Sequence, residues 1–521
     1  MADIEKLSSF EKAENVATVL VQEYAPVNAS GHRDQLDRQY SLLSICATAL
    51  TIDNAWPVLG GSVAIAKHHA GPPGIIYEFL VACVWYGFLA ASLAELASSI
   101  PSSGGVYHYG SVTPGTRYGR VLGYYSGSII WAAWIAATAA AINIPASIII
   151  QMYSLYHPNY VSQGWQIYVV SLIVNWSCVA CVIFGNRFLP VIYKVALFVL
   201  IAGGLVTVIV LAVLPRTHGT NSSVWVDFEN ATGYSGGLAF LSGVLNGAFT
   251  IGTPESVTHM AEELPEPRKD LPKAIAAQII LGTLTGLVYA VALMYSVSDL
   301  TGALATRNAG TFPLAAIYLQ AMNNNISATM GLLFIVLLSV WIAGCGCYVT
   351  NGRTWWSMSR DGATPFSKFF SRASAKRSCP IEATIFCGIM TSALGAIQAA
   401  SSTAFSDLAG SFVVLSTISY VIPIAAHLFT GRKNVPIGPF WMAKYGYFVN
   451  AMAVLLTILF DIIFCFPYSL PVTTPTMNYT SVIIIGYIIL VTIWWFVHGG
   501  QYAGPHIPHL EEAGKRVKEV I

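Results

Sequence analysis

The sequence predicts an all-α polytopic membrane protein, and three observations support that prediction. Of the 521 residues, 55% are hydrophobic and only 10% are charged, whereas soluble domains carry roughly 25% charged residues. The apolar runs are about 20 residues or longer, which is the length of a membrane-crossing α-helix rather than the ~10 residues of a barrel strand. Two of these runs are interrupted near their centres by Gly or Pro beside a carboxylate, which indicates an internal repeat.

We expect twelve transmembrane helices. Their approximate limits are residues 41–66, 74–99, 122–152, 165–185, 189–214, 236–262, 272–297, 327–358, 380–400, 404–429, 443–467 and 477–498. Residues 1–40 and 499–521 are more polar and are expected to form the N-terminal and C-terminal tails.

The distribution of Lys and Arg predicts the orientation of these helices. Of the 26 Lys and Arg residues, two fall within spans and three fall in the loops away from the tails, namely Lys67, Arg216 and Arg307. All the others lie on the side of the two tails. Because cytoplasmic loops carry an excess of Lys and Arg, both termini are expected in the cytoplasm. The outer loops also contain glycosylation sequons, which predict a glycoprotein, at Asn221, Asn230 and Asn325.

The sixth span, 236–262, is interrupted at its centre. Gly252, Thr253 and Pro254 stand there and are followed at once by Glu255. Gly and Pro weaken a helix, and Pro removes a backbone donor. An unpaired backbone group is costly in hydrocarbon, so a break is tolerated where it lines a cavity or is buried in protein. Two explanations remain open: a broken helix that binds a solute, or a Pro kink whose Glu255 is satisfied by a neighbouring side chain.

The first span, 41–66, repeats this feature. Its centre reads D-N-A-W-P at 53–57, and Gly60 follows closely. Five spans separate the two interruptions, which predicts an inverted five-plus-five repeat with halves 41–214 and 236–429, followed by two more helices in 443–498. In such a repeat the broken segments meet near the bilayer centre, where free helix ends offer N–H groups to an anion and carbonyls to a cation.

Three side chains in other spans have two explanations each. Trp131 and Trp134 are three residues apart in span three, so they share one helical face. They either stack on a cationic group or belong to the core. Lys194 lies near the inner end of span five. It either extends its amine to the membrane interface, or it replaces a coupling cation or titrates.

Several classes of function are disfavoured by the composition. No nucleotide-binding loop, nucleophile elbow or metal signature is present, so an enzyme is not expected. The nine cysteines lie almost all within apolar runs and are expected to be core residues, with no metal site and no cofactor. The net charge of +1 gives no reason to expect nucleic acid as a partner.

Several short motifs resemble a known family. The chain reads E-L-A-S at 95–98 and G-G-V-Y at 104–107, has a charged, Pro-rich loop at 261–272, and reads S-R-D-G at 359–362. On these motifs the sequence resembles the amino acid–polyamine–organocation (APC) superfamily over about residues 42–496. Residues 258–262, 438–441 and 466–479 resemble its fungal branch of choline, GABA and related amine permeases, most of all the choline permeases.

The resemblance implies a LeuT-like fold of ten core helices plus two, which works by alternating access. In such proteins the substrate lies between the unwound parts of helices one and six, with walls from helices three, eight and ten. Together with the candidates above, the expected substrate-binding residues are Asp53, Asn54, Ala55, Trp56, Gly60, Trp131, Trp134, Phe249, Gly252, Thr253, Glu255 and Trp341.

We therefore expect a proton-coupled symporter of the plasma membrane that imports choline or a related cationic amine. Asp53 is expected to pair with the cation, and Trp56 and the gate residue Phe249 to add cation–π contact. Glu255 is the expected proton carrier, because burial favours its neutral form. His259, one turn further on, is close enough for contact, and it either shares the proton or only packs there. The third proton-coupling candidate is Lys194.

Other functions stay open. A GABA or amino-acid permease needs an anion site, which backbone N–H groups near Gly60 or at the second break would supply. A nutrient sensor binds without translocating, and would carry a longer terminal extension than the tails of about 40 and about 20 residues found here. Sodium is the alternative to protons as the coupling ion, and the positive charge of Lys194 argues against it.

Overall fold

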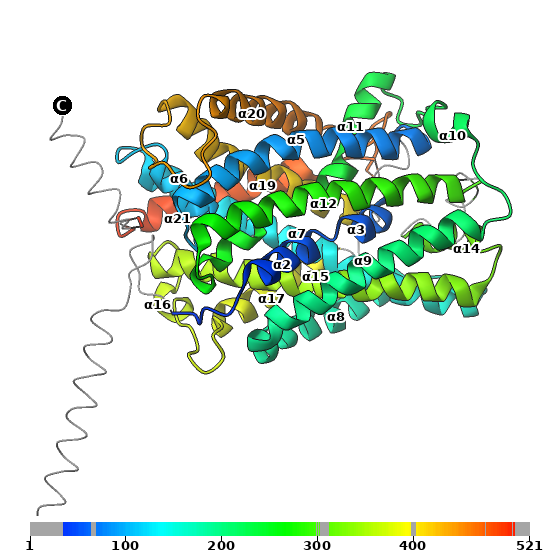
Figure 1. The fold of residues 1–521 in the computed structure, drawn as a ribbon, viewed down its shortest axis with the longest axis horizontal. Helices are drawn as coiled ribbons and strands as arrows, with labels where there is room; N and C mark the ends of the chain where they lie inside the picture. Colours follow the sequence, from blue (N-terminus) through cyan, green and yellow to red (C-terminus); the bar gives the residue numbers. More distant parts are fainter. Residues whose placement is uncertain are drawn as a thin grey trace, which may run out of the picture.

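The structure, a computed structural model, describes residues 35–63, 69–298, 300, 302, 312–397, 403–474, 476–502 and 504–505. Within these ranges the secondary structure is helical, and one isolated β-bridge joins Ser374 and Cys379. The long helices run side by side along the longest axis of the molecule (Figure 1). The prediction of an all-α protein is confirmed.

Nine helical segments of the described chain are long and apolar enough to cross a membrane. They comprise α2 (Leu42–Asp53) with α3 (Ala55–Gly61), α5 (Gly71–Ser99), α7 (Gly119–Tyr156), α8 (Gly164–Gly185) with η1 (Asn186–Phe188) and α9 (Leu189–Val213), α12 (Pro267–Ser296), α15 (Ile326–Arg360), α19 (Ala404–Phe429), α20 (Tyr445–Ile463) and α21 (Thr480–His498). Two apolar helices are shorter: α11 (Gly236–Thr250) and α17 (Ile381–Gly395). The connecting helices are α6 (Val106–Val112), α10 (Asn221–Trp225), α14 (Leu314–Ala321) and α16 (Ser367–Phe370).

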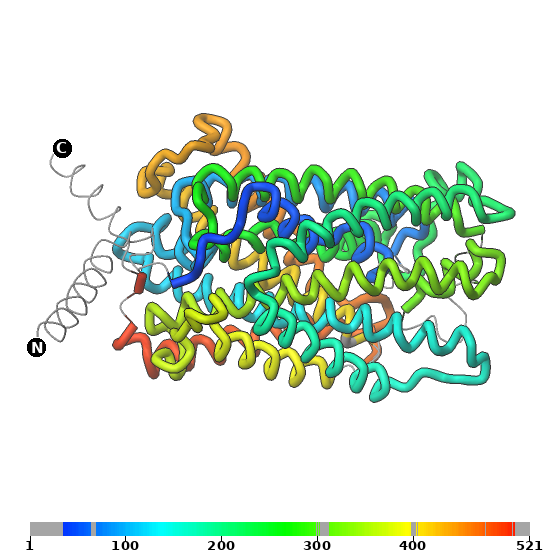
Figure 2. Tube along the Cα trace, turned by 60° about the horizontal axis from the view of Figure 1, so that its bottom comes forward, coloured from blue at the N-terminus to red at the C-terminus, as the bar shows by residue number. Residues whose placement is uncertain are grey.

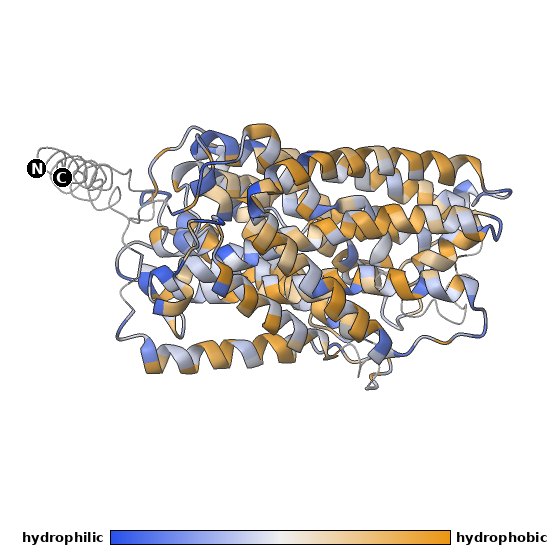
Figure 3. Ribbon diagram, turned by 90° about the horizontal axis from the view of Figure 1, so that it is seen from below, coloured by the Kyte–Doolittle hydropathy of each residue, from blue (hydrophilic) through white to orange (hydrophobic). Residues whose placement is uncertain are grey.

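The position of each helix explains its composition. Helix α7 packs against both α15 and α19 and is largely buried, whereas α21 and the α8–α9 segment lie at the periphery. These peripheral helices expose large apolar side chains such as Phe184, Phe198 and Phe496. Figure 3 shows hydrophobic residues along the outer helices. Soluble proteins rarely expose apolar surface on this scale, so this surface is suited to contact with lipid.

The break in the first span is a single residue. Asn54 adopts the left-handed conformation, with φ 48°, between α2 and α3. Apart from Gly, Asn is among the residues that most often adopt this conformation. Pro57 falls in the first turn of α3, where its missing N–H has no intrahelical acceptor to lose. Gly60 lies inside α3. The interruption therefore lies before these helix-breaking residues and not at them.

The break in the sixth span is longer. Helix α11 ends at Thr250, residues 251–255 are not helical, and the chain continues as the 3-10 helix η2 (Ser256–Glu263). Gly252 and Pro254 lie within this break, as the sequence predicted, and Glu255 lies at its end. All residues from 251 to 263 are buried, which is the condition under which an irregular backbone is tolerated at membrane depth.

The two ends of the described chain lie at the same end of the bundle. The main-chain nitrogen of Tyr40 donates to the oxygen of Glu263 at 3.2 Å, and Arg120 Nη1 donates to the oxygen of Tyr502 at 3.3 Å. Figure 2 shows the start of α2 and the end of α21 on this side. We call it the terminal end, and the opposite end, which carries α10 and α14, the distal end (Figure 1).

Candidate functional site

Three aromatic rings from three helices form one wall beside the second break. The ring centroids of Phe249 on α11 and Phe412 on α19 are 6.1 Å apart, and those of Phe412 and Trp134 on α7 are 5.9 Å apart. Gly252 lies against this wall, because a Cβ there would come within 3.1 Å of the Phe412 ring. Aromatic faces attract cationic groups. We call these four residues, together with Glu255, the aromatic site.

Glu255 adds a carboxyl group to the aromatic site. Its side chain is fully buried, and the indole N–H of Trp134 donates a hydrogen bond to Oε1. The hydroxyl of Thr258 donates to the main-chain oxygen of Glu255 at 2.7 Å. The carboxyl group is therefore held between the central helix α7 and the first turn of η2.

His259 contacts the other oxygen of this carboxyl group. Its Nε2 lies 2.6 Å from Glu255 Oε2, and both side chains are fully buried. Nδ1 of the same ring lies 2.9 Å from the main-chain oxygen of Ser103. Because a carbonyl oxygen only accepts, the Nδ1 contact fits the tautomer with its hydrogen on Nδ1, and Nε2 is then directed at Oε2. The Glu255–His259 pair therefore has the geometry in which one proton can be shared between a carboxyl group and an imidazole.

Asp53, at the end of α2, faces α12. Its Oδ1 accepts hydrogen bonds from Thr253 Oγ1 and from Gln278 Nε2, each at 3.0 Å. Its Oδ2 is directed at Gly282, where a Cβ would come within 2.8 Å of it. We call Asp53, Thr253 and Gln278 the Asp53 network. The network joins the two breaks to α12, and Oδ2 is buried without a hydrogen-bond partner among the described residues. The contacts of Asp53 are therefore to α12 and the second break, and its pairing with a cation stays a prediction.

Polar atoms without partners lie at both breaks. Asn54 is wholly buried, and neither its amide nitrogen nor its amide oxygen has a hydrogen-bond partner among the described residues. The hydroxyl oxygen of Ser256, at the start of η2, is likewise buried without a partner in this part of the chain. Burying an unsatisfied polar group costs about 1–3 kcal/mol. A polar solute or water between the breaks would satisfy these atoms.

Three other predicted residues of the first span contact the neighbouring helices instead. Trp56 Nε1 donates to the main-chain oxygen of Leu200 on α9 at 3.0 Å. Gly60 lies directly against the hydroxyl of Tyr289 on α12, and Ala55 also contacts α12. These three residues therefore fix α3 against α9 and α12, and the geometry does not support their expected contact with a solute at the aromatic site.

Two of the predicted tryptophans also face away from the aromatic site. Trp131 stacks on Phe386 of α17, with 5.8 Å between ring centroids. Trp341 Nε1 donates to Ser177 Oγ on α8 at 2.9 Å. Although Trp131 and Trp134 are three residues apart, their rings contact different neighbours. For Trp131 the geometry therefore favours the core alternative.

Lys194 is exposed on α9. Tyr193 and Ala196, three residues apart on one face of α9, are buried, whereas the neighbouring Val195 is exposed like Lys194, so the lysine projects from the opposite face of the helix. A lysine in this position extends its amine toward the membrane interface. The structure therefore favours the interfacial alternative for Lys194 and does not support its role in proton coupling.

Sequence reasoning missed two residues of the site. Phe412 lies in a run of apolar residues in α19, where nothing local distinguishes it from other core side chains. Gln278 did offer a signal, because it is a lone amide within an apolar span, and intramembrane polar residues are rare and often functional. The contacts of Phe412 and Gln278 with the site depend on how the helices pack, which the sequence alone does not show.

Buried ion pairs close the bundle at the terminal end. Arg353 Nη2 lies 2.6 Å from Glu263 Oε1, and Arg360 Nη2 lies 2.6 Å from Glu262 Oε1. Both acids belong to η2 and both arginines to α15. Gln39 Nε2 adds a hydrogen bond of 2.7 Å to Glu263. The segment that follows the aromatic site is therefore locked to α15 in this structure.

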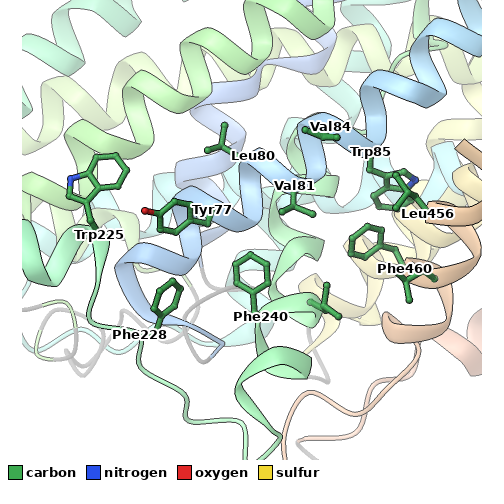
Figure 4. Close-up of a pocket in the computed structure, with 12 residues that line it drawn as sticks. Tyr77, Leu80, Val81, Val84, Trp85, Trp225, Phe228, Phe240, Leu456 and Phe460 are labelled. Carbon is green, nitrogen blue, oxygen red and sulfur yellow. The ribbon is translucent and has the colours of Figure 1, made fainter. Parts of the chain in front are cut away.

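A large apolar groove lies elsewhere on the molecule. It has a volume of about 760 Å³ and is lined by side chains of α5, α11 and α20 and of the segment around α10. Figure 4 shows Tyr77, Val81 and Trp85 on α5 facing Phe240 and Phe460 across it. Its lining contains no charged side chain, so the groove is unsuited to a small charged solute.

No group of three or more His, Cys, Asp or Glu side chains in the described ranges could hold a metal ion. All nine cysteines lie within those ranges and are free thiols. The titratable groups beside the aromatic wall are the carboxyl group of Glu255 and the imidazole of His259.

A many-helix membrane bundle with two broken helices and buried carboxyl groups at both breaks is the architecture of a secondary transporter. Comparison with known proteins then identifies the family. The profile of the amino acid permease family matches residues 41–490, and the chain belongs to that family.

Individual relatives agree with this assignment. The chain is 29% identical over 469 residues to a choline transporter of Saccharomyces cerevisiae, covering 89% of this chain and 82% of the relative. It is 31% identical over 443 residues to a swainsonine transporter of Arthroderma benhamiae, covering 83% and 85%. It is 26% identical over 492 residues to an amino-acid permease of Arabidopsis thaliana, covering 91% and 94%. The protein is therefore a multi-pass membrane transporter and not an enzyme.

Proposed function

We propose that the protein is a proton-coupled symporter that imports choline or a related cationic amine by alternating access. One observation carries the proposal: Glu255 is held between Trp134 and His259 beside the wall formed by Phe249 and Phe412. Ring faces bind a quaternary ammonium group, and the adjacent acid–imidazole pair holds a proton. The similarity to the choline transporter of Saccharomyces cerevisiae over most of its length supports this substrate class.

The shared proton suggests how coupling works. With one proton the Glu255–His259 pair is neutral, and it can be buried without an uncompensated charge. Without the proton the pair is anionic, which favours contact with water and an open site. We therefore place one proton on the pair in the closed, loaded state, and we place its release on the cytoplasmic side, after the ion pairs of the terminal end separate. Substrate and proton then favour closure together.

The proposal includes a topology of twelve spans. Helices α8 and α9 are counted as two separate crossings. Helix α11 together with η2 is one further crossing, and α17 is another. With the eight other long segments this gives twelve. Breaks in the first and sixth crossings support an inverted repeat. Of the Arg and Lys residues that the structure describes, most lie at the terminal end, including Arg268, Arg360 and Arg377. By the positive-inside rule this end is cytoplasmic, with the distal end outside a plasma membrane.

The test is uptake of labelled choline into vesicles that contain the purified protein, with an imposed gradient that is acidic outside. We expect choline to accumulate only when the gradient is present, and we expect Glu255→Gln to lose accumulation. Glu229→Gln, which changes an exposed glutamate of the loop after α10, is the matched control and should behave as wild type. Choline accumulation that does not depend on the gradient would refute proton coupling.

A second candidate function is an amino-acid permease that takes GABA or a similar solute. The similarity to the Arabidopsis thaliana amino-acid permease favours it, and so do the unpartnered amide of Asn54 and hydroxyl of Ser256, which offer hydrogen bonds to a carboxylate. Labelled GABA in the same vesicles separates the two functions, because its accumulation with choline inert would select this one. Binding of either solute without entry would instead indicate a sensor.

A further inference from the structure

A buried carboxyl group outside the aromatic site has no role in the mechanism above. Glu78 is the eighth residue of α5, about 11 Å from its distal start at a rise of about 1.5 Å per residue. The residue is 1% exposed. Neither of its carboxyl oxygens has a hydrogen-bond partner among the described residues. An acid at membrane depth without any partner requires an explanation.

The surroundings of Glu78 form a notch between α5 and α11. A Cβ at Gly243 of α11 would collide with both carboxyl oxygens, and a Cβ at Gly74 would come within 3.0 Å of Oε1. One turn beyond Gly243, Asn246 uses its oxygen to accept a hydrogen bond from Ser62 at 2.6 Å. The amide nitrogen of Asn246 is buried without a partner in the described part of the chain. Two glycines therefore make room for the carboxyl group in this notch.

Among the described residues, no opposite charge forms an ion pair with this acid. Helices α3, α10 and α11 carry no titratable side chain. The titratable side chains that α12, α19 and α20 bring to the same membrane depth already have hydrogen-bond partners, namely Tyr289 with Tyr318, Tyr295 with Asn221, Asp407 with Thr403 and Asp461 with Thr417. Within α5 itself, Tyr77 and Cys83 bring no positive charge, and Glu229 of the neighbouring loop is exposed and acidic. The buried His69, which precedes α5, makes an interaction of its own. An ionised Glu78 would therefore be an isolated buried charge, which is unfavourable.

We propose that Glu78 is a second proton-binding group, separate from the Glu255–His259 pair and placed on the distal side of the aromatic site. A proton is the ligand that fits, because the notch offers too few free oxygen atoms to replace the hydration shell of a metal cation. In the closed structure Glu78 carries its proton. It exchanges that proton with the distal solution when α11 moves away from α5. This inference rests on the proposed proton-coupled transport.

Infrared spectroscopy detects a proton on Glu78 without any measurement of transport. A protonated carboxyl group gives a carbonyl stretching band in the infrared, whereas a carboxylate does not. In purified protein at neutral pH, where exposed acids are ionised, we expect a band that is lost in Glu78→Gln and retained in Glu229→Gln. Glu78→Asp keeps a carboxyl group with a shorter reach and should shift the band without removing it. A band unchanged in Glu78→Gln would overturn the proposal.

The transport assay then separates this inference from the proposed function. We expect Glu78→Gln to move fewer protons per choline than wild type and to depend less on the pH of the distal solution. Unchanged proton-to-choline ratio and pH dependence in this variant would overturn the role of Glu78. If wild-type protein moves no choline under any gradient, the proposed function fails, and the infrared comparison alone decides whether Glu78 binds a proton.

Discussion

The two breaks of the bundle place their carboxyl groups in different surroundings. At the first break one residue, Asn54, leaves the helical conformation, and α3 continues at once. Asp53 beside it is bonded to the neutral donors Thr253 and Gln278. At the second break residues 251–255 leave the helix, and Glu255 meets both an indole and an imidazole. The sequence around both breaks looks alike, yet only one of the two acids faces the aromatic wall.

This difference teaches that the length of a break decides what its carboxyl group can reach. A single left-handed residue changes the direction of the chain but leaves Asp53 on the helical surface that faces α12. A longer break detaches Glu255 from the surface of α11 and turns it toward α7. This difference supports the proposal of reversible proton binding at the second break, while the Asp53 network joins the first break to the second break and to α12.

The largest effect is expected for Glu255→Gln. The substituted amide still accepts from the Trp134 indole, but it cannot share a proton with His259. A hydrogen bond to a charged group contributes about 1.5–3 kcal/mol, so we expect proton-driven choline uptake to fall by about 10- to 150-fold. The initial rate of uptake under an imposed gradient measures this loss. Exchange of choline without a gradient should persist, and its disappearance would mean that Glu255 is needed for binding instead.

The next effect is expected at the aromatic wall. Phe412→Ala removes the ring that contacts both Phe249 and Trp134. A cation–π contact contributes about 0.5–2 kcal/mol, so the Kd for choline should rise by about 2- to 30-fold. Equilibrium binding of labelled choline in detergent measures it, and Phe412→Tyr, which keeps the ring, is the control. Equal affinities for choline in Phe412→Ala and wild type would show that the substrate lies elsewhere.

Part of this site could be predicted from the sequence, because some features are local. Apolar runs located the helices, and Gly252 with Pro254 located the second break. The spacing of Glu255 and His259 predicted their contact, which is present. These predictions depend on hydropathy, on backbone chemistry and on distances within one turn of helix, all of which a single sequence contains.

The remaining features could not be predicted because they depend on helix rotation and on distant partners. Trp56 and Trp131 lie in the expected spans, but each ring faces a helix that the sequence does not place beside it. Phe412 reaches the site only because α19 packs against α7. Asp53 was predicted to bind the substrate because of its charge. The direction of its carboxyl group depends on a hydrogen bond from Gln278, which lies in another span. Local patterns show where a helix breaks but not which way its side chains turn.

A smaller effect tests the first break directly. At φ 48° a residue with a Cβ is strained, and the left-handed conformation costs roughly 1–2 kcal/mol for most L-residues. We therefore expect Asn54→Ala to reduce stability by about 1 kcal/mol and Asn54→Gly to cost less, because Gly adopts positive φ readily. Thermal unfolding in detergent measures both variants. Equal losses of stability would show that the amide group matters rather than the backbone conformation.

The smallest effect is expected for Asp53→Asn, which compares the two carboxyl groups most directly. An asparagine keeps one oxygen that can accept from Thr253 and Gln278, so the Asp53 network retains its hydrogen bonds. Since a neutral hydrogen bond contributes about 0.5–1.5 kcal/mol and here both are kept, we expect choline uptake to change by less than about fivefold. The comparison is between the choline uptake rates of Asp53→Asn and Glu255→Gln, measured in parallel vesicle preparations. A collapse of choline uptake in Asp53→Asn, with binding lost as well, would mean that Asp53 pairs with the cation. The two breaks would then share substrate binding, and the Asp53 network would be more than a structural link between the breaks and α12.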